Sequence, residues 1–81
     1  MAVIQLRALL AEEAGARRIE VQATTLGEGL RALPVHRLVL DEHGRLRPLV
    51  NVFVDGQRER SLSAPLAPDA VVTVVAAVAG G

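Results

Sequence analysis

The segment from Leu49 to Val54 restricts the fold of this chain more than any other stretch of its sequence. It is rich in β-branched residues, which favour the extended conformation of a strand. Asp55-Gly56 follows directly, and this dipeptide is preferred in the type I′ turn of a two-residue β-hairpin. We therefore expect Leu49–Val54 to be a strand and Gln57–Arg60 to pair back onto it.

Three further segments are expected to be strands. They are Met1–Leu10, Arg18–Ala23 and Ala70–Val75. In the first two, apolar and polar residues alternate with the period of two that is typical of a strand buried on one face. The inner face of the first would carry Ile4, Leu6 and Ala8, and this strand would form an antiparallel hairpin with the second. A sheet with a helix on one face also permits the first and last strands to pair in parallel at its centre.

A helix is expected to begin at Thr25. Thr25 and Glu28 have the spacing of a capping box, in which the hydroxyl and the carboxylate satisfy free amides at a helix start. One apolar stripe follows, formed by Leu26, Leu30 and Leu33. Two glycines in the segment each cost roughly 1 kcal/mol relative to alanine, so the helix needs tertiary support. Pro34 disfavours helical geometry at the residue before it and marks the expected end.

The remaining segments carry weaker signals. Residues 34–48 are expected to form an irregular crossover with at most one short strand fragment, and residues 61–68, which contain two prolines, a loop with at most one helical turn around Leu62. The predicted fold is thus an α+β domain over residues 1–75, in which a mixed sheet of four to five strands covers one main helix. Residues 76–81 would form an extended, flexible C-terminal tail.

The composition excludes several classes of function. Eighty-one residues are enough for one domain with one core. Nine basic residues balance nine acidic ones, so neither nucleic acid nor an anionic membrane is expected as a partner. The chain has no cysteine, which excludes disulfides, thiolate ligands and a cysteine nucleophile, and no metal site is expected. It has neither a long apolar span nor a signal-peptide pattern, so we expect a cytoplasmic protein.

Two segments resemble a known family. Val50–Gly56 and the ending Val78-Ala79-Gly80-Gly81 are similar to the ubiquitin-like sulfur carriers, which include the small subunit of molybdopterin synthase, the thiamine sulfur carrier and the cysteine-synthesis carrier. The order and length of the elements agree over essentially the whole chain, which implies the ubiquitin-like β-grasp fold. Ala67–Ala70 departs from the acidic turn common in these families, and Val75–Ala77 from the aromatic-Pro-Pro of the molybdopterin subunit. These departures disfavour the molybdopterin assignment.

The resemblance implies a carrier rather than an enzyme. An adenylating enzyme would use ATP to place AMP on the C-terminal carboxylate of Gly81, and a desulfurase or rhodanese-type donor would then replace AMP to leave a thiocarboxylate. A biosynthetic enzyme for molybdopterin, cysteine, thiamine or another thio-metabolite would accept the sulfur. Gly80, Ala79 and Val78 would thread through a narrow channel of the partner, since glycine has no Cβ to obstruct it. No cofactor is expected on the chain itself.

A second candidate site lies on the Leu49–Val54 strand. If the three valines of this strand face the helix, Phe53 points to the opposite face, where a lone aromatic residue could anchor a protein partner. The alternative is that Phe53, the single aromatic residue, is simply the largest core residue. Arg58 and Arg60, on the paired strand, would supply a charged rim to the same partner-binding surface.

Two other functions share these features. The chain could be a protein modifier that is conjugated to other proteins through Gly81. It could also be a binding module without covalent chemistry. The carrier and the modifier share the adenylation step, whereas the binding module needs none.

Overall fold

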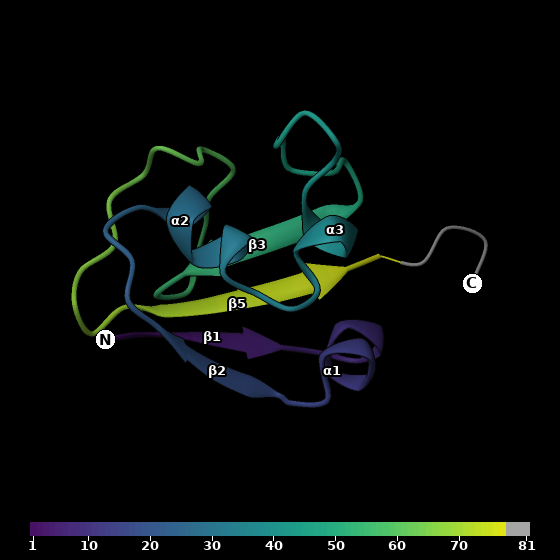
Figure 1. Cartoon of the computed structure of the whole chain (residues 1–81). Coiled ribbons are helices and arrows are strands. Elements are labelled where there is room, and N and C mark those ends of the chain that lie inside the picture. The colour runs from purple at the N-terminus through teal and green to yellow at the C-terminus, as the bar shows by residue number, and fades with distance from the viewer. Residues whose placement is uncertain (78–81) are drawn as a thin grey trace.

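The computed structural model describes residues 1–77, which form one five-stranded sheet and three short helices (Figure 1). The strands are β1 (Ala2–Leu6), β2 (Arg18–Val21), β3 (Val50–Val54), β4 (Gln57–Arg58) and β5 (Val71–Ala76). Their order across the sheet is β2-β1-β5-β3-β4. β1 and β5 pair in parallel at the centre, and the other pairs are antiparallel. The expected α+β fold and the parallel pairing of the first and last strands are therefore confirmed.

The core lies between one face of the sheet and the helices. The helices are α1 (Leu9–Ala14), α2 (Leu26–Arg31) and α3 (His36–Val39). Alternate strand residues are fully buried against the apolar stripe of α2; they include Ile4, Val52, Val72 and Val74. Leu26 and Leu30 are buried on α2, which confirms the main helix; Leu33 is also buried but lies beyond the helix, which ends at Arg31, two residues earlier than expected. None of the helices within residues 1–77 is long and apolar enough to cross a bilayer.

The first strand is shorter than expected, because a helix follows it. β1 ends at Leu6, and Ala8 is exposed with a φ of 50°, so its expected place on the inner face of a strand is wrong. Helix α1 instead buries Leu10. It ends at Gly15, whose left-handed φ of 73° lets its amide donate to two carbonyls of the last turn. The antiparallel pairing of β1 with β2 is confirmed, with Ile4 opposite Ile19.

Helix α2 is held by a loop as well as by its cap. The hydroxyl of Thr25 accepts from the Glu28 amide (3.3 Å), as the capping box predicts. The carboxylate of Glu28 accepts from the amide and hydroxyl of Thr24 rather than from the Thr25 amide. The Gly27 amide donates to the Leu62 carbonyl at 2.9 Å, and a Cβ on Gly27 would lie only 3.1 Å from that oxygen. A side chain at this glycine would thus press on the loop.

The crossover and the second hairpin also differ in detail from expectation. Residues 34–48 contain helix α3, which was not expected, and a single bridge between Leu40 and Leu46 that corresponds to the strand fragment. Residues 61–68 contain turns and no helix. The Asp55-Gly56 turn has a positive φ at both positions, as a type I′ turn requires. β4 ends at Arg58, although the Glu59 amide still donates to the Val52 carbonyl.

Candidate functional site

The candidate reactive end of the chain is attached to the central strand of the sheet. β5 extends to Ala76, and the Ala77 amide donates to the Leu49 carbonyl at 2.8 Å. Val78, Ala79, Gly80 and Gly81 lie outside the described residues. Their roles in threading and in chemistry therefore stay predictions, and the structure provides the position from which they start.

Phe53 lies on the face of the sheet that carries no helix. It sits opposite Thr73 of β5 and Arg58 of β4, and it is half-buried. Its strand neighbours Val50 and Val52 are buried on the helix side. Phe53 is thus not part of the buried core, so of the two alternatives for its side chain the structure supports the open face. Its role in partner binding stays a prediction.

The open face around Phe53 is a mixed apolar and polar surface. Its half-buried members come from the three central strands; they are Val3, Gln5, Asn51, Phe53, Thr73 and Val75. The Thr73 hydroxyl lies 3.4 Å from the amide oxygen of Gln5, a long hydrogen bond across the β1–β5 pair. Arg58 is exposed beside Phe53 and can supply the expected charge at its edge.

Arg60 does not lie with Arg58 on this face. It follows β4, and its guanidinium donates to the carbonyls of Val50 (2.7 Å) and Arg47 (3.1 Å) at the start of β3. The cause is a turn: the Glu59 carboxylate accepts from the amides of Arg60 (3.1 Å) and Ser61 (3.0 Å), which takes the chain out of the sheet. The Leu49 carbonyl points to β5 and the Val52 carbonyl to the β4 side, so the Val50 carbonyl also points away from β5, and the Arg60 charge lies beside the start of β3 with that strand between it and β5. No pattern in the sequence indicated this placement.

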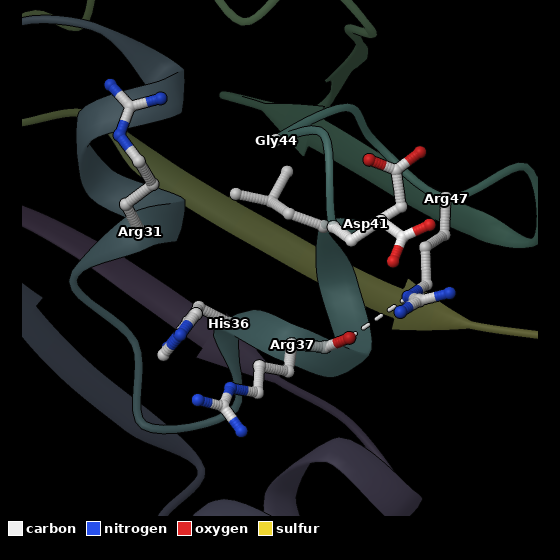
Figure 2. A pocket seen from close by; sticks show the side chains of 8 residues that line it. Arg31, His36, Arg37, Asp41, Gly44 and Arg47 are labelled. Carbon is white, nitrogen blue, oxygen red and sulfur yellow. Dashed lines mark hydrogen bonds between the residues drawn. The ribbon is translucent and has the colours of Figure 1, made fainter.

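A hollow of about 390 Å³ lies beside α2, α3 and the loop that follows (Figure 2). Its lining is charged with both signs and includes Arg31, Arg37, Arg47, Asp41 and Glu42. Figure 2 shows the guanidinium groups of Arg31 and Arg37 pointing away from each other. Binding of a small anion requires basic groups that converge on one point, and these two guanidinium groups do not.

Two polar groups of this hollow are engaged in the structure of the loop. The Asp41 carboxylate accepts from the amides of Arg45 (3.0 Å) and His43 (2.8 Å), and these hydrogen bonds hold the pKa of Asp41 below its ordinary value. Nε of Arg47 donates to the Arg37 carbonyl (3.0 Å). Within residues 1–77, no group of three metal-ligating side chains comes together, and no buried polar side-chain atom lacks a partner.

Comparison with known proteins gives matches among solved structures. The sequence matches no protein-family model and no curated protein. SAMP1 from Haloferax volcanii is 30% identical, with a TM-score of 0.81 over 99% of this chain and 98% of that one. CysO from Mycobacterium tuberculosis is 21% identical, with a TM-score of 0.84 over 96% and 100%. The BexX/CysO complex from Amycolatopsis orientalis gives 20% identity and a TM-score of 0.80 over the full length of both chains.

The two CysO chains are too distant in sequence to show more than the fold, which is the ubiquitin-like β-grasp. The match to SAMP1 combines that fold with substantial identity over nearly the whole of both chains. The chain belongs to the ubiquitin-like family of sulfur carriers and protein modifiers. Its neighbours in that family are small carrier proteins rather than enzymes.

Proposed function

We propose that this chain is a sulfur carrier whose C-terminal Gly81 carboxylate is adenylated and converted to a thiocarboxylate. The supporting observation is the coincidence of two independent features. The domain has the family fold with 30% identity to a relative over nearly its whole length, and the sequence ends in the Gly80-Gly81 pair. The chain is in this proposal a co-substrate of other enzymes and not a catalyst.

The chemistry explains why a partner enzyme is needed. A C-terminal carboxylate has a pKa of about 3.3–3.7, so it is ionised at neutral pH and is a poor electrophile. Attack of a carboxylate oxygen on the α-phosphorus of ATP releases pyrophosphate and leaves an acyl-adenylate. Hydrosulfide that displaces AMP leaves the thiocarboxylate directly. A persulfide of the donor displaces AMP to give an acyl disulfide, and a thiol then cleaves its S–S bond, which releases the thiocarboxylate on Gly81 and leaves a disulfide between that thiol and the donor. Two terminal glycines leave this carbonyl unobstructed.

The described domain suits a carrier because the attachment point of the tail is rigid. β5 is flanked by β1 on one side and β3 on the other, so the strand that leads to the tail is hydrogen-bonded along both edges. A partner that binds the domain therefore fixes the starting point of residues 78–81. In this proposal Val78 occupies an apolar pocket of the partner while Ala79 and Gly80 pass through its channel.

The partners in the proposal are an adenylating enzyme, a sulfur donor and a sulfur-accepting biosynthetic enzyme. CysO of A. orientalis is seen in complex with BexX, which supports the idea that a domain of this fold binds a different protein. The acceptor pathways that we propose are those of molybdopterin, cysteine, thiamine or another thio-metabolite. The sequence departures before β5 and at its end weigh against molybdopterin.

A second candidate function is conjugation to other proteins. It is favoured by one specific observation, which is that the SAMP1 of Haloferax volcanii matched above is a small archaeal modifier protein; a second structure of it is 28% identical over 95% of this chain. Conjugation would use the same acyl-adenylate, with a lysine amine in place of the sulfur nucleophile. The two functions thus share one activated intermediate and diverge only after it.

Intact-mass measurement separates these functions. The chain is incubated with the adenylating enzyme from its own organism, ATP and a sulfur source. A mass gain equal to one exchange of oxygen for sulfur is expected for the carrier, and adducts of higher mass with other proteins for the modifier. An unchanged mass, in a reaction where a known carrier is converted, would contradict both and favour a non-covalent binding module.

A further inference from the structure

Most of the exposed large apolar residues of the domain lie at the end of the sheet where the chain leaves β5. Residues 1–77 contain five large apolar residues that are exposed. Leu9 (44% exposed), Leu38 (43%) and Leu49 (51%) lie near the end of β5, whereas Met1 and Val71 lie at the other end of the sheet, where β1 and β5 begin. Single exposed leucines are ordinary on a protein surface, but a group of them around one point marks an interaction site.

The pairing of the strands places Leu9 and Leu49 at the same end of the sheet. β1 runs parallel to β5, with Leu6 opposite Val74, so Leu9 at the start of α1 lies beyond the same edge. α1 also packs against β5. β3 runs antiparallel and starts at this edge, so Leu49 lies next to the end of β5, and its carbonyl accepts from the Ala77 amide.

Helix α3 is attached to the same edge. The Val39 carbonyl accepts from the Arg47 amide, and the Arg47 carbonyl accepts from the amide of Val50, the first residue of β3. Leu38 is the exposed neighbour of the buried Val39. Figure 1 shows α1 and α3 at the end of β5 from which the chain continues. We refer to Leu9, Leu38 and Leu49 as the exit collar.

The length of the tail brings a partner onto the exit collar. Four residues follow Ala77 in the sequence, and a fully extended chain spans at most about 3.6 Å per residue, so Gly81 can be at most about 14 Å from Ala77. The adenylating enzyme must hold the Gly81 carboxylate in an enclosed site. The enzyme surface around its channel must therefore lie against the end of the sheet where Leu9, Leu38 and Leu49 are exposed.

We infer that the exit collar is the docking surface for the adenylating enzyme, which presents an apolar rim with carboxylates around the mouth of its channel. The inference rests on the proposed function of Gly81. The carboxylates are expected because two carbonyls fix the guanidinium of Arg60 beside the start of β3, at the same end of the sheet but on the side of β3 away from β5. No acidic side chain within residues 1–77 forms an ion pair with it. Arg60 is thus a partner-binding residue at the rim of the docking surface in this inference, rather than on the Phe53 face.

The test is ATP–pyrophosphate exchange by the adenylating enzyme of the same organism, measured against carrier concentration. The variants are Leu9→Asp, Leu38→Asp and Leu49→Asp. We expect each to raise the KM for the carrier by about tenfold or more, because a charge at an apolar contact must be desolvated, while kcat at saturation stays within about twofold. Ala67→Asp, an exposed apolar residue in the loop before β5, is the matched control and should leave KM within about twofold.

The possible results separate this inference from the proposed function. If the collar variants leave KM unchanged, with or without a lowered kcat, the collar is not the docking surface. Exchange by the wild-type chain would in that case still support the proposed adenylation of Gly81. A wild-type chain that supports no exchange overturns both. If the wild-type chain is a dimer and the collar variants are monomers, the collar binds a second copy of the chain and the inference is overturned. Thermal melts check folding, and Leu→Gln at the same positions replaces any aspartate variant that is unfolded.

Discussion

The carboxylate of Glu28 shows how one side chain makes the fold sensitive to pH. It accepts from the Thr24 hydroxyl (2.6 Å), the Thr24 amide (3.3 Å) and the Thr25 hydroxyl (3.3 Å). These hydrogen bonds, that of the Thr24 hydroxyl first, hold the pKa of Glu28 below its ordinary value. A group whose pKa is lower in the folded than in the unfolded chain stabilises the fold above the unfolded pKa, which is about 4.3 for glutamate. This stabilisation is lost as pH falls through the folded pKa.

Glu28→Gln should therefore flatten the dependence of stability on pH. Glutamine keeps the shape of the side chain and can still accept at the helix start, but it does not titrate in this range. We expect the urea midpoint of the wild type to fall more between about pH 6 and about pH 3 than that of the variant. Asp41, whose pKa is also lowered, contributes equally to both proteins. Equal slopes for the two proteins would show that Glu28 does not contribute.

Phe53 allows binding to be separated from folding. Because it lies on the open face and outside the buried core, Phe53→Ala should lower the free energy of unfolding by only about 1 kcal/mol, the range of strand propensity. If Phe53 anchors a partner, the same change should weaken binding of at least one enzyme partner by about tenfold or more, as measured by calorimetry. Ser63→Ala, at an exposed position in the loop of residues 61–68 and off this face, is the control. Unchanged affinity for the activating and the accepting enzymes would remove Phe53 from the binding surface.

At the scale of the element, helix α2 contains two glycines that should respond oppositely to substitution. A Cβ on Gly29 would meet its nearest atom at 3.5 Å, an ordinary contact. Gly29→Ala should therefore raise the free energy of unfolding by up to about 1 kcal/mol. A Cβ on Gly27 would lie 3.1 Å from the Leu62 carbonyl oxygen and 3.2 Å from Leu62 Cβ. Gly27→Ala should lower the free energy of unfolding, because the loop must shift. Chemical denaturation of the pair measures both signs, and stabilisation by both would contradict the close approach of the loop.

The elements that could be predicted from the sequence are those with a repeating pattern. Alternation in β3 and the Asp55-Gly56 turn predicted the second hairpin. Helix α2 is no longer than α1, but its start carries the Thr25 cap that the sequence shows. Helices α1 and α3 were missed because neither begins with a side-chain cap. In α1, the apolar residues that follow β1 continue the pattern of a strand, and the change to helix occurs at Ala8, where φ becomes positive.

At the scale of the whole molecule, the candidate site joins positions that are distant in sequence. The terminal glycines could be singled out from the sequence because their chemistry needs only their own atoms. The exit collar could not, since the strand pairs β1–β5 and β3–β5 bring Leu9 and Leu49 to one end of the sheet, and hydrogen bonds from Val39 to Arg47 and from Arg47 to Val50 attach α3, with Leu38, to the same end. The same holds for Arg60, whose long side chain reaches carbonyls of residues 10 and 13 positions earlier in the chain.

The core stabilises the fold, and the proposed chemistry takes place at Gly81. Folding and sulfur transfer should therefore be lost through different variants. Deleting Gly81 should abolish the mass gain of the proposed reaction, because the new terminus is one residue short of the adenylation site. It should leave the melting temperature unchanged, since glycine has no side chain to bury and the buried core of residues 1–77 extends no further than Val74.

Leu30→Ala, which removes a fully buried side chain of α2, is the contrasting variant. It should lower the free energy of unfolding by about 2–5 kcal/mol, out of a total of about 5–15 kcal/mol. Its folded fraction should still be converted, because Gly81 is intact. A deletion variant that still gains sulfur would refute Gly81 as the carrier residue, and one that melts at a much lower temperature would show that the terminus belongs to the folded domain.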